Sequence, residues 1–144
     1  MTFAYFDTSA LVKRYVRERG SAQVGSMLRR HDLLSSAITP VEVLSALWRR
    51  KRSGDLSEEN FSATLSRVQS DRSRWELIEV GETVLSRAEE IVQVTVPVRA
   101  LDAIHVASLM IFHAASSIQI PFVTGDVRQR DAATHLGLDV VWVG

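Results

Sequence analysis

Four acidic residues stand where a carboxylate could take part in chemistry. Asp7 and Asp126 each end a short apolar run, whereas Glu42 and Asp102 each lie near the start of a segment with helical spacing. Ionised carboxylates that share one site repel each other unless a cation lies among them. Oxygen ligands of this kind suit a hard cation such as Mg²⁺ or Mn²⁺, which can activate water and stabilise charge on a phosphate. If the four side chains meet, they are equipped to hydrolyse a phosphodiester.

Each acid also has a purely structural interpretation. Asp7 and Asp126 are suited to cap the helices that follow them. The segment TPVE matches the capping-box pattern, with Thr39 as the cap and Glu42 reaching back to it. Asp102 would be stabilised by the dipole of its own helix. Convergence of all four side chains on one place would distinguish a metal site from four separate helix caps.

The elements that must position these acids alternate between short apolar strands and helices. Strands are predicted at residues 2–7, 33–38, 76–80, 118–126 and 139–143, and helices at 8–19, 21–30, 39–54, 56–75, 81–94, 99–115 and 127–138. Because hairpin signals are absent, this order predicts an α/β fold, with a mostly parallel five-stranded sheet between two layers of helices. In such a sheet the strand ends and helix starts share one edge, where ligands bind. We therefore expect the four acids to line one crevice.

Composition narrows the class of protein. The 144 residues fit a single domain over residues 1–144, and 46% apolar with 24% charged residues is typical of a globular protein. No segment approaches the roughly 20 apolar residues of a membrane span, and no secretion signal is recognisable. The lack of cysteine excludes disulfides and thiolate metal sites and favours a cytoplasmic protein. A net charge of zero argues against a protein that mainly coats nucleic acid.

Four segments together resemble the signature blocks of a known family. They are YFDTSALVKRY, TPVEVLSAL, LDAIHVASL and FVTGDVRQRDAATHLGLDVV, and their order and spacing span essentially the whole chain. They are similar to PIN-domain nucleases, and specifically to the VapC-type ribonuclease toxins of bacterial toxin–antitoxin pairs. The resemblance implies a PIN-like sandwich, an RNA substrate, a homodimer, and a cognate antitoxin protein as inhibitory partner.

The same resemblance assigns roles to six side chains. It implies that the acidic quartet binds Mg²⁺ or Mn²⁺ and carries catalysis, and that two hydroxyls support the carboxylates. The quartet is Asp7, Glu42, Asp102 and Asp126, and the hydroxyls are those of Ser9 and Thr124. The function that follows is a metal-dependent endoribonuclease. Two alternatives stay open, namely a catalytically inactive PIN-like module that binds RNA or protein, and a DNA nuclease on the same fold.

Other motifs carry weaker signals. The basic run RRKR at residues 49–52 suits the negative end of a helix dipole, and as an RNA-binding surface it would act with the RNA contacts predicted at Arg72, Arg74 or Arg99. His105 lies three residues after Asp102 and could orient it, although a packed, hydrogen-bonded histidine is favoured because its neighbours are apolar. Asp131 is interpreted as a solvated helix acid rather than a further metal ligand. No zinc, P-loop or dinucleotide motif is present.

Overall fold

The computed structural model describes residues 1–94 and 96–144, and its centre is a parallel sheet of five strands. The strands are β1 (Phe3–Phe6), β2 (Asp32–Ser36), β3 (Glu76–Ile78), β4 (Phe122–Thr124) and β5 (Val140–Trp142). Their order across the sheet is β3-β2-β1-β4-β5, and every neighbouring pair is parallel. The predicted five-stranded parallel sheet is confirmed.

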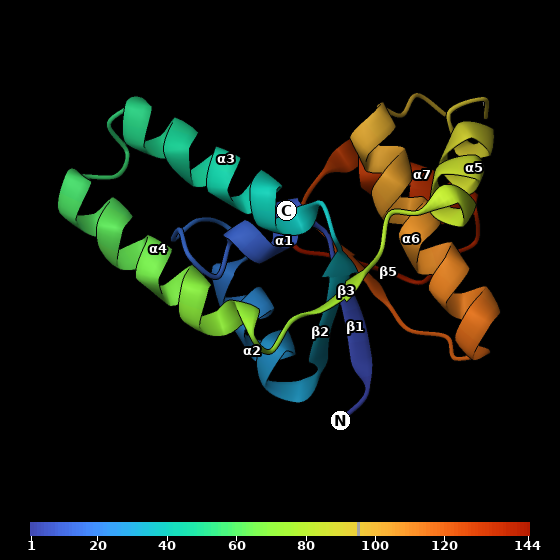
Figure 1. The fold of residues 1–144 in the computed structure, drawn as a ribbon, viewed down its shortest axis with the longest axis horizontal. Coiled ribbons are helices and arrows are strands. Elements are labelled where there is room, and N and C mark those ends of the chain that lie inside the picture. The colour runs from blue at the N-terminus through green and yellow to red at the C-terminus, as the bar shows by residue number, and fades with distance from the viewer. Residues whose placement is uncertain (95) are drawn as a thin grey trace.

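Helices cover both faces of this sheet. They are α1 (Thr8–Val12), α2 (Ser21–Arg30), α3 (Thr39–Arg52), α4 (Glu58–Arg72), α5 (Glu82–Ile91), α6 (Ala100–Ser116) and α7 (Val127–His135). Figure 1 shows α1 to α4 on one side and α5 to α7 on the other, with α3 and α4 extending away from the sheet as a helical hairpin. None of the helices in the described part of the chain is long and apolar enough to cross a membrane.

Two hydrophobic cores result, one on each face of the sheet. Successive side chains of a strand point to opposite faces, so β1 serves both cores. Ala4 and Phe6 pack with residues of α1 to α4, whereas Tyr5 packs with residues of α5 to α7. Tyr5 and Phe6 are fully buried. The strand β1 therefore contacts both helical layers, and Asp7 directly follows its carboxyl end.

The predicted helix over residues 8–19 is wrong beyond Val12. The chain turns after α1, and the buried Lys13 donates from Nζ to the carbonyl oxygen of Arg19 at 2.6 Å and to Glu18 Oε1 at 3.2 Å. Apolar residues in this turn still pack into the core, so the periodicity persists although the helix does not. The predicted strand over residues 118–126 is likewise restricted to β4.

Gly20 allows the chain to start α2 from this turn. Its φ is +88°, and a Cβ placed on it would lie 1.9 Å from the carbonyl oxygen of Val143. Gly54 has the same φ of +88° but has no neighbouring atom within 4 Å of such a Cβ. Substituting each glycine in turn therefore distinguishes the cost of the left-handed backbone from the cost of the steric contact with Val143.

We predict that Gly20→Ala destabilises the fold more than Gly54→Ala. The left-handed backbone costs an alanine about 1–2 kcal/mol at either position, and the contact with Val143 adds roughly 1–3 kcal/mol at Gly20. Urea unfolding of the two variants measures the difference. Equal free energies of unfolding for the two variants would show that the backbone at Val143 can shift away from residue 20 without destabilising the protein.

Candidate active site

The quartet lies at the carboxyl edge of the sheet. Asp7 follows β1 directly, Asp126 lies two residues after β4, and Glu42 and Asp102 lie in the first turns of α3 and α6. Glu42, Asp102 and Asp126 line one cavity of about 580 Å³, which we call the acidic cavity. Asp7 is fully buried, and it is linked to this cavity through the lining residue Ser9.

Hydroxyl groups hold the Asp7 carboxylate in its buried position. Its Oδ1 accepts hydrogen bonds from Ser9 Oγ at 2.7 Å and from the backbone N–H of Ala10 at 2.9 Å, and its Oδ2 accepts one from Thr124 Oγ1. Ser9 Oγ in turn accepts from the N–H of Gly125 at 2.9 Å. Burial raises the pKa of Asp7, and these donors oppose the rise. Asp7 also caps α1, so the structural and the chemical interpretations coexist at this residue.

Glu42 is held by a different device from the one that the sequence suggested. The predicted capping box is wrong, because Thr39 is the first residue of α3 and Ile38 occupies the N-cap position. The Thr39 hydroxyl instead forms a hydrogen bond with the hydroxyl of Ser35 at 2.6 Å. Glu42 Oε1 accepts from Thr8 Oγ1 at 2.6 Å and from His105 Nε2 at 2.7 Å. Burial acts to raise the pKa of Glu42, but these two donors outweigh it and lower the pKa.

His105 belongs to α6 and is fully buried. Because a carboxylate only accepts hydrogen bonds, Nε2 donates to Glu42. In the tautomer that carries its proton on Nε2, Nδ1 accepts from the hydroxyl of Tyr5 at 2.8 Å. Burial raises the pKa of Tyr5 well above its ordinary value, which keeps this donor protonated. His105 is therefore a packed, hydrogen-bonded histidine, and its partner in the quartet is Glu42 rather than Asp102.

Asp102 and Asp126 are brought together by the starts of α6 and α7. Asp126 caps α7 by accepting from the N–H of Gln129 at 3.1 Å, and Asp102 accepts from the N–H of Arg99 at 3.4 Å. Partial burial raises the pKa of Asp102, and the negative charge of Asp126 raises it further. The two carboxylates therefore lie close enough to repel each other.

Gln129 links these acids to the interior of the cavity. Its Nε2 donates to Asp102 Oδ1 at 3.2 Å, and the residue is 5% exposed. Its Oε1 is the single buried side-chain polar atom in residues 1–94 and 96–144 that has no hydrogen-bond partner. Buried polar atoms are normally paired, so a group that donates to Oε1 is expected in the acidic cavity.

The donor set fits a hydrated divalent cation. Among the described residues, no three histidine, cysteine, aspartate or glutamate side chains converge closely enough to hold a metal ion directly. Mg²⁺ commonly keeps several waters and takes only one or two protein carboxylates. The mutual repulsion of Asp102 and Asp126 and the unpaired Oε1 of Gln129 both suit an ion that approaches with part of its water shell.

Only some of the basic side chains considered in the sequence lie near the acids. Arg49 and Arg50, from the basic run at residues 49–52, line the acidic cavity together with Lys13. Arg99 lies beside Asp102 as the residue that precedes α6. Arg74 instead binds Asp71 Oδ1 at 2.8 Å and lines a separate cavity near the amino ends of the strands.

Two further residues lie outside the acidic cavity. Arg72 is exposed at the last position of α4 and does not line the cavity. Asp131 is exposed on α7 and pairs with the neighbouring Arg130 at 3.1 Å, in agreement with its interpretation as a solvated helix acid. The basic rim of the acidic cavity is therefore provided by α3 and the turn after α1, and not by the end of α4.

Comparisons with known proteins agree with the observed fold. A family model described as the PIN domain matches residues 4–134. Among solved structures, a chain of a toxin–antitoxin complex from Klebsiella pneumoniae is similar, with a TM-score of 0.68 and 17% sequence identity over 98% of each chain. A search of curated protein sequences returned no match. At this identity the structural similarity speaks for the fold alone.

We predict that Asp126→Asn lowers the pKa of Asp102 in metal-free buffer. Asparagine caps a helix about as well as aspartate, so the substitution removes the charge and keeps the cap. Because folding raises the pKa of Asp102, its contribution to stability is largest at low pH and declines as pH rises through the folded value. Asp126→Asn should show a smaller decline. Carboxyl NMR titration and unfolding at a series of pH values measure both effects.

The matched control for that variant is Asp131→Asn, an exposed acid on the same helix. It should leave the titration of Asp102 unchanged. An Asp102 pKa that is the same in all three proteins would mean that the two carboxylates do not interact.

We also predict that His105→Leu raises the pKa of Glu42. The substitution removes one of the two donors that keep Glu42 ionised, and it leaves the buried hydroxyl of Tyr5 without its acceptor, at a cost of about 1–3 kcal/mol. Tyr5→Phe is the control, because it removes the other hydrogen bond of His105 without touching Glu42. Carboxyl NMR titration distinguishes the two variants. A Glu42 pKa that responds equally to both would contradict a direct role of His105.

Proposed function

The chain belongs to the PIN domain family, and from this premise we propose that it is a metal-dependent endoribonuclease that acts as the toxin of a toxin–antitoxin pair. The observation that carries the proposal is the acidic cavity. Three carboxylates from three different helix starts line it, and a fourth lies buried behind the lining residue Ser9. Four unrelated helix caps would not need to converge in this way.

The quartet would hold a Mg²⁺ or Mn²⁺ ion. Glu42, Asp102 and Asp126 offer oxygens to the cavity, and Asp7 retains acceptor capacity on Oδ2, which receives a single hydrogen bond from the described residues. When bound, such an ion supplies a water of lowered pKa for attack on the phosphodiester and offsets the charge of the phosphate.

The remaining side chains keep the acids charged and in place. Thr8 and His105 hold Glu42 ionised, and Ser9 and Thr124 hold the buried Asp7. Gln129 fixes Asp102 with its amide nitrogen, so its unpaired Oε1 can orient a water in the cavity. Arg49 and Arg50 lie on the rim, where a guanidinium fork matches the oxygens of a bound phosphate.

Two protein partners are part of the proposal. A cognate antitoxin is supported by the similar structure, which is described as a toxin–antitoxin complex. A second copy of the chain is the other expected partner. Val41 and Trp48 on α3 are 65% and 47% exposed, and apolar side chains gathered on one helix are often covered by a partner protein.

We predict that the purified chain cleaves single-stranded RNA internally in the presence of Mg²⁺ or Mn²⁺, and that EDTA stops the reaction. Asp102→Asn and Glu42→Gln should each lower the rate on the order of 100-fold or more, because each removes a carboxylate that would hold the metal ion. Asp131→Asn is the matched control and should cleave at the wild-type rate. Circular dichroism verifies that every variant is folded.

Three results would redirect the proposal. Cleavage that continues in EDTA or in Asp102→Asn would exclude the metal mechanism. Faster cleavage of a DNA strand of the same sequence would identify a DNA nuclease. RNA binding without cleavage, under every metal tested, would identify an inactive binding module.

A further inference from the structure

Two further cavities lie beside the acidic cavity along α1 and α2, and each shares lining residues with the next. A second cavity of about 800 Å³ lies along the turn after α1 and the start of α2, and it shares the lining residues Lys13 and Glu18 with the acidic cavity. A third cavity of about 500 Å³ shares Arg14 and Gly25 with the second. We call the second and third cavities together the basic groove. It leads from the acidic cavity toward the amino ends of the strands, where Met1 lines it.

The basic groove carries an excess of positive charge in a chain whose net charge is zero. Six basic and three acidic side chains line it. The basic ones are Lys13, Arg14, Arg17, Arg29, Arg67 and Arg74, and the acidic ones are Glu18, Asp32 and Asp71. Glu18 is already paired with Lys13 and Arg50, and Asp71 with Arg14 and Arg74. The charge that the groove presents to a ligand is therefore positive.

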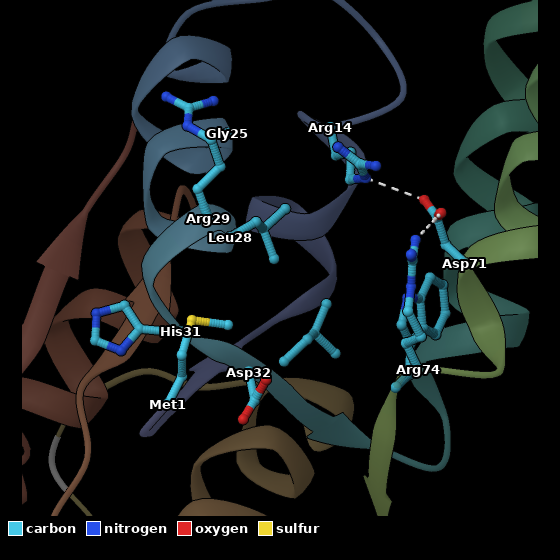
Figure 2. Close-up of a pocket in the computed structure, with 11 residues that line it drawn as sticks. Met1, Arg14, Gly25, Leu28, Arg29, His31, Asp32, Asp71 and Arg74 are labelled. Carbon is cyan, nitrogen blue, oxygen red and sulfur yellow. Dashed lines mark hydrogen bonds and ion pairs between the residues drawn. The ribbon is translucent and has the colours of Figure 1, made fainter.

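Asp71 fixes two arginine side chains along the groove through ion pairs. It is buried at the end of α4 and accepts from Arg14 Nε at 3.0 Å, from Arg74 at 2.8 Å and from the hydroxyl of Tyr15 at 2.7 Å. These contacts lower the pKa of Asp71 although burial acts to raise it. Figure 2 shows Arg14 and Arg74 directed at Asp71 on one side of the third cavity and Arg29 of α2 on the other.

Several donors along the groove are not used within the chain. Arg14 binds Asp71 through Nε, so its two Nη groups remain for a ligand in the part of the chain that is described. Arg17 and Arg29 are exposed and make no ion pair with the residues in 1–94 and 96–144. Guanidinium groups that are pre-positioned and unpaired suit a row of phosphates, because each fork matches two phosphate oxygens.

We propose that the basic groove binds the phosphate backbone of single-stranded RNA on one side of the cleavage site. The proposal rests on the ribonuclease function, since it makes the groove an extension of the acidic cavity. A strand that extends from the acidic cavity along the groove meets Arg14 and Arg17, and then Arg29 and Arg74. RNA is favoured over an acidic protein segment because the groove lies beside a cavity suited to phosphodiester chemistry, with which it shares Lys13 and Glu18.

The test measures RNA binding without cleavage. Fluorescence anisotropy in Mg²⁺, with RNA made non-cleavable by 2′-O-methyl groups, compares a short strand of about 4 nucleotides, which spans little more than the acidic cavity, with a long strand of about 16. The full chain is compared with the double variant Arg17→Ala/Arg29→Ala. The control is Arg19→Ala/Arg30→Ala, which removes the same charge from exposed neighbours that do not line the groove.

The Arg17→Ala/Arg29→Ala variant should bind the long strand about tenfold more weakly than the wild type. A plot of its log affinity against log salt concentration should be less steep by about 1.4, which corresponds to two lost phosphate contacts. The control pair should match the wild type, and the short strand should bind equally to all three proteins. This result would support the groove even if the protein fails to cleave RNA, so the two proposals can fail separately.

Three outcomes would overturn the proposal. Equal weakening by the groove and control pairs would show a general charge effect. No affinity of the wild type for the long strand beyond that for the short one would show that the groove is not used. An acidic peptide of equal charge that binds more tightly than RNA, and loses affinity in the groove variant, would assign the groove to a protein partner.

Discussion

The mutual repulsion of carboxylates at one edge of the sheet is the constraint on which the rest of the site depends. Burial and the negative charge of Asp126 raise the pKa of Asp102, and Asp7 is fully buried nearby. Burying such charge is unfavourable unless each carboxylate is hydrogen-bonded and a cation offsets the total. The chain meets the first condition with its own donors. The second condition explains why a cation is expected in the acidic cavity.

The four acids are not all held by the same local contacts. Asp7 and Asp126 cap the helices that follow them, which fixes their backbone at the ends of β1 and β4. Glu42 has no such anchor and depends on Thr8 and His105. Because His105 lies on α6, it ties the start of α3 to the helix that carries Asp102. The position of Glu42 therefore depends on how α3 and α6, which cover opposite faces of the sheet, pack against each other.

The features that could be predicted from the sequence are those that depend on local chemistry and on the general rules of parallel sheets. Apolar strand runs and helix spacing were enough to identify five parallel strands and to place Asp7 and Asp126 at their ends. The contact of His105 with Glu42 spans 63 residues, and no local pattern distinguishes it from any packed histidine. For the same reason the sequence could not say that Arg49 and Arg50, and not Arg72 or Arg74, line the acidic cavity. Position along a helix does not say toward which edge of the sheet that helix runs.

The early end of α1 shows how the site and the groove depend on each other. Had α1 continued past Val12, Lys13 would have followed the helix instead of turning back to the carbonyl oxygen of Arg19. In the observed turn, Lys13 lies against Gly125, where an added Cβ would come within 2.7 Å of its side chain. Gly125 separates Thr124 from Asp126, so a larger residue there would displace either the lysine or an acid. The break in α1 thus places a buried ammonium group between the acidic cavity and the basic groove, where the two surfaces of opposite charge meet.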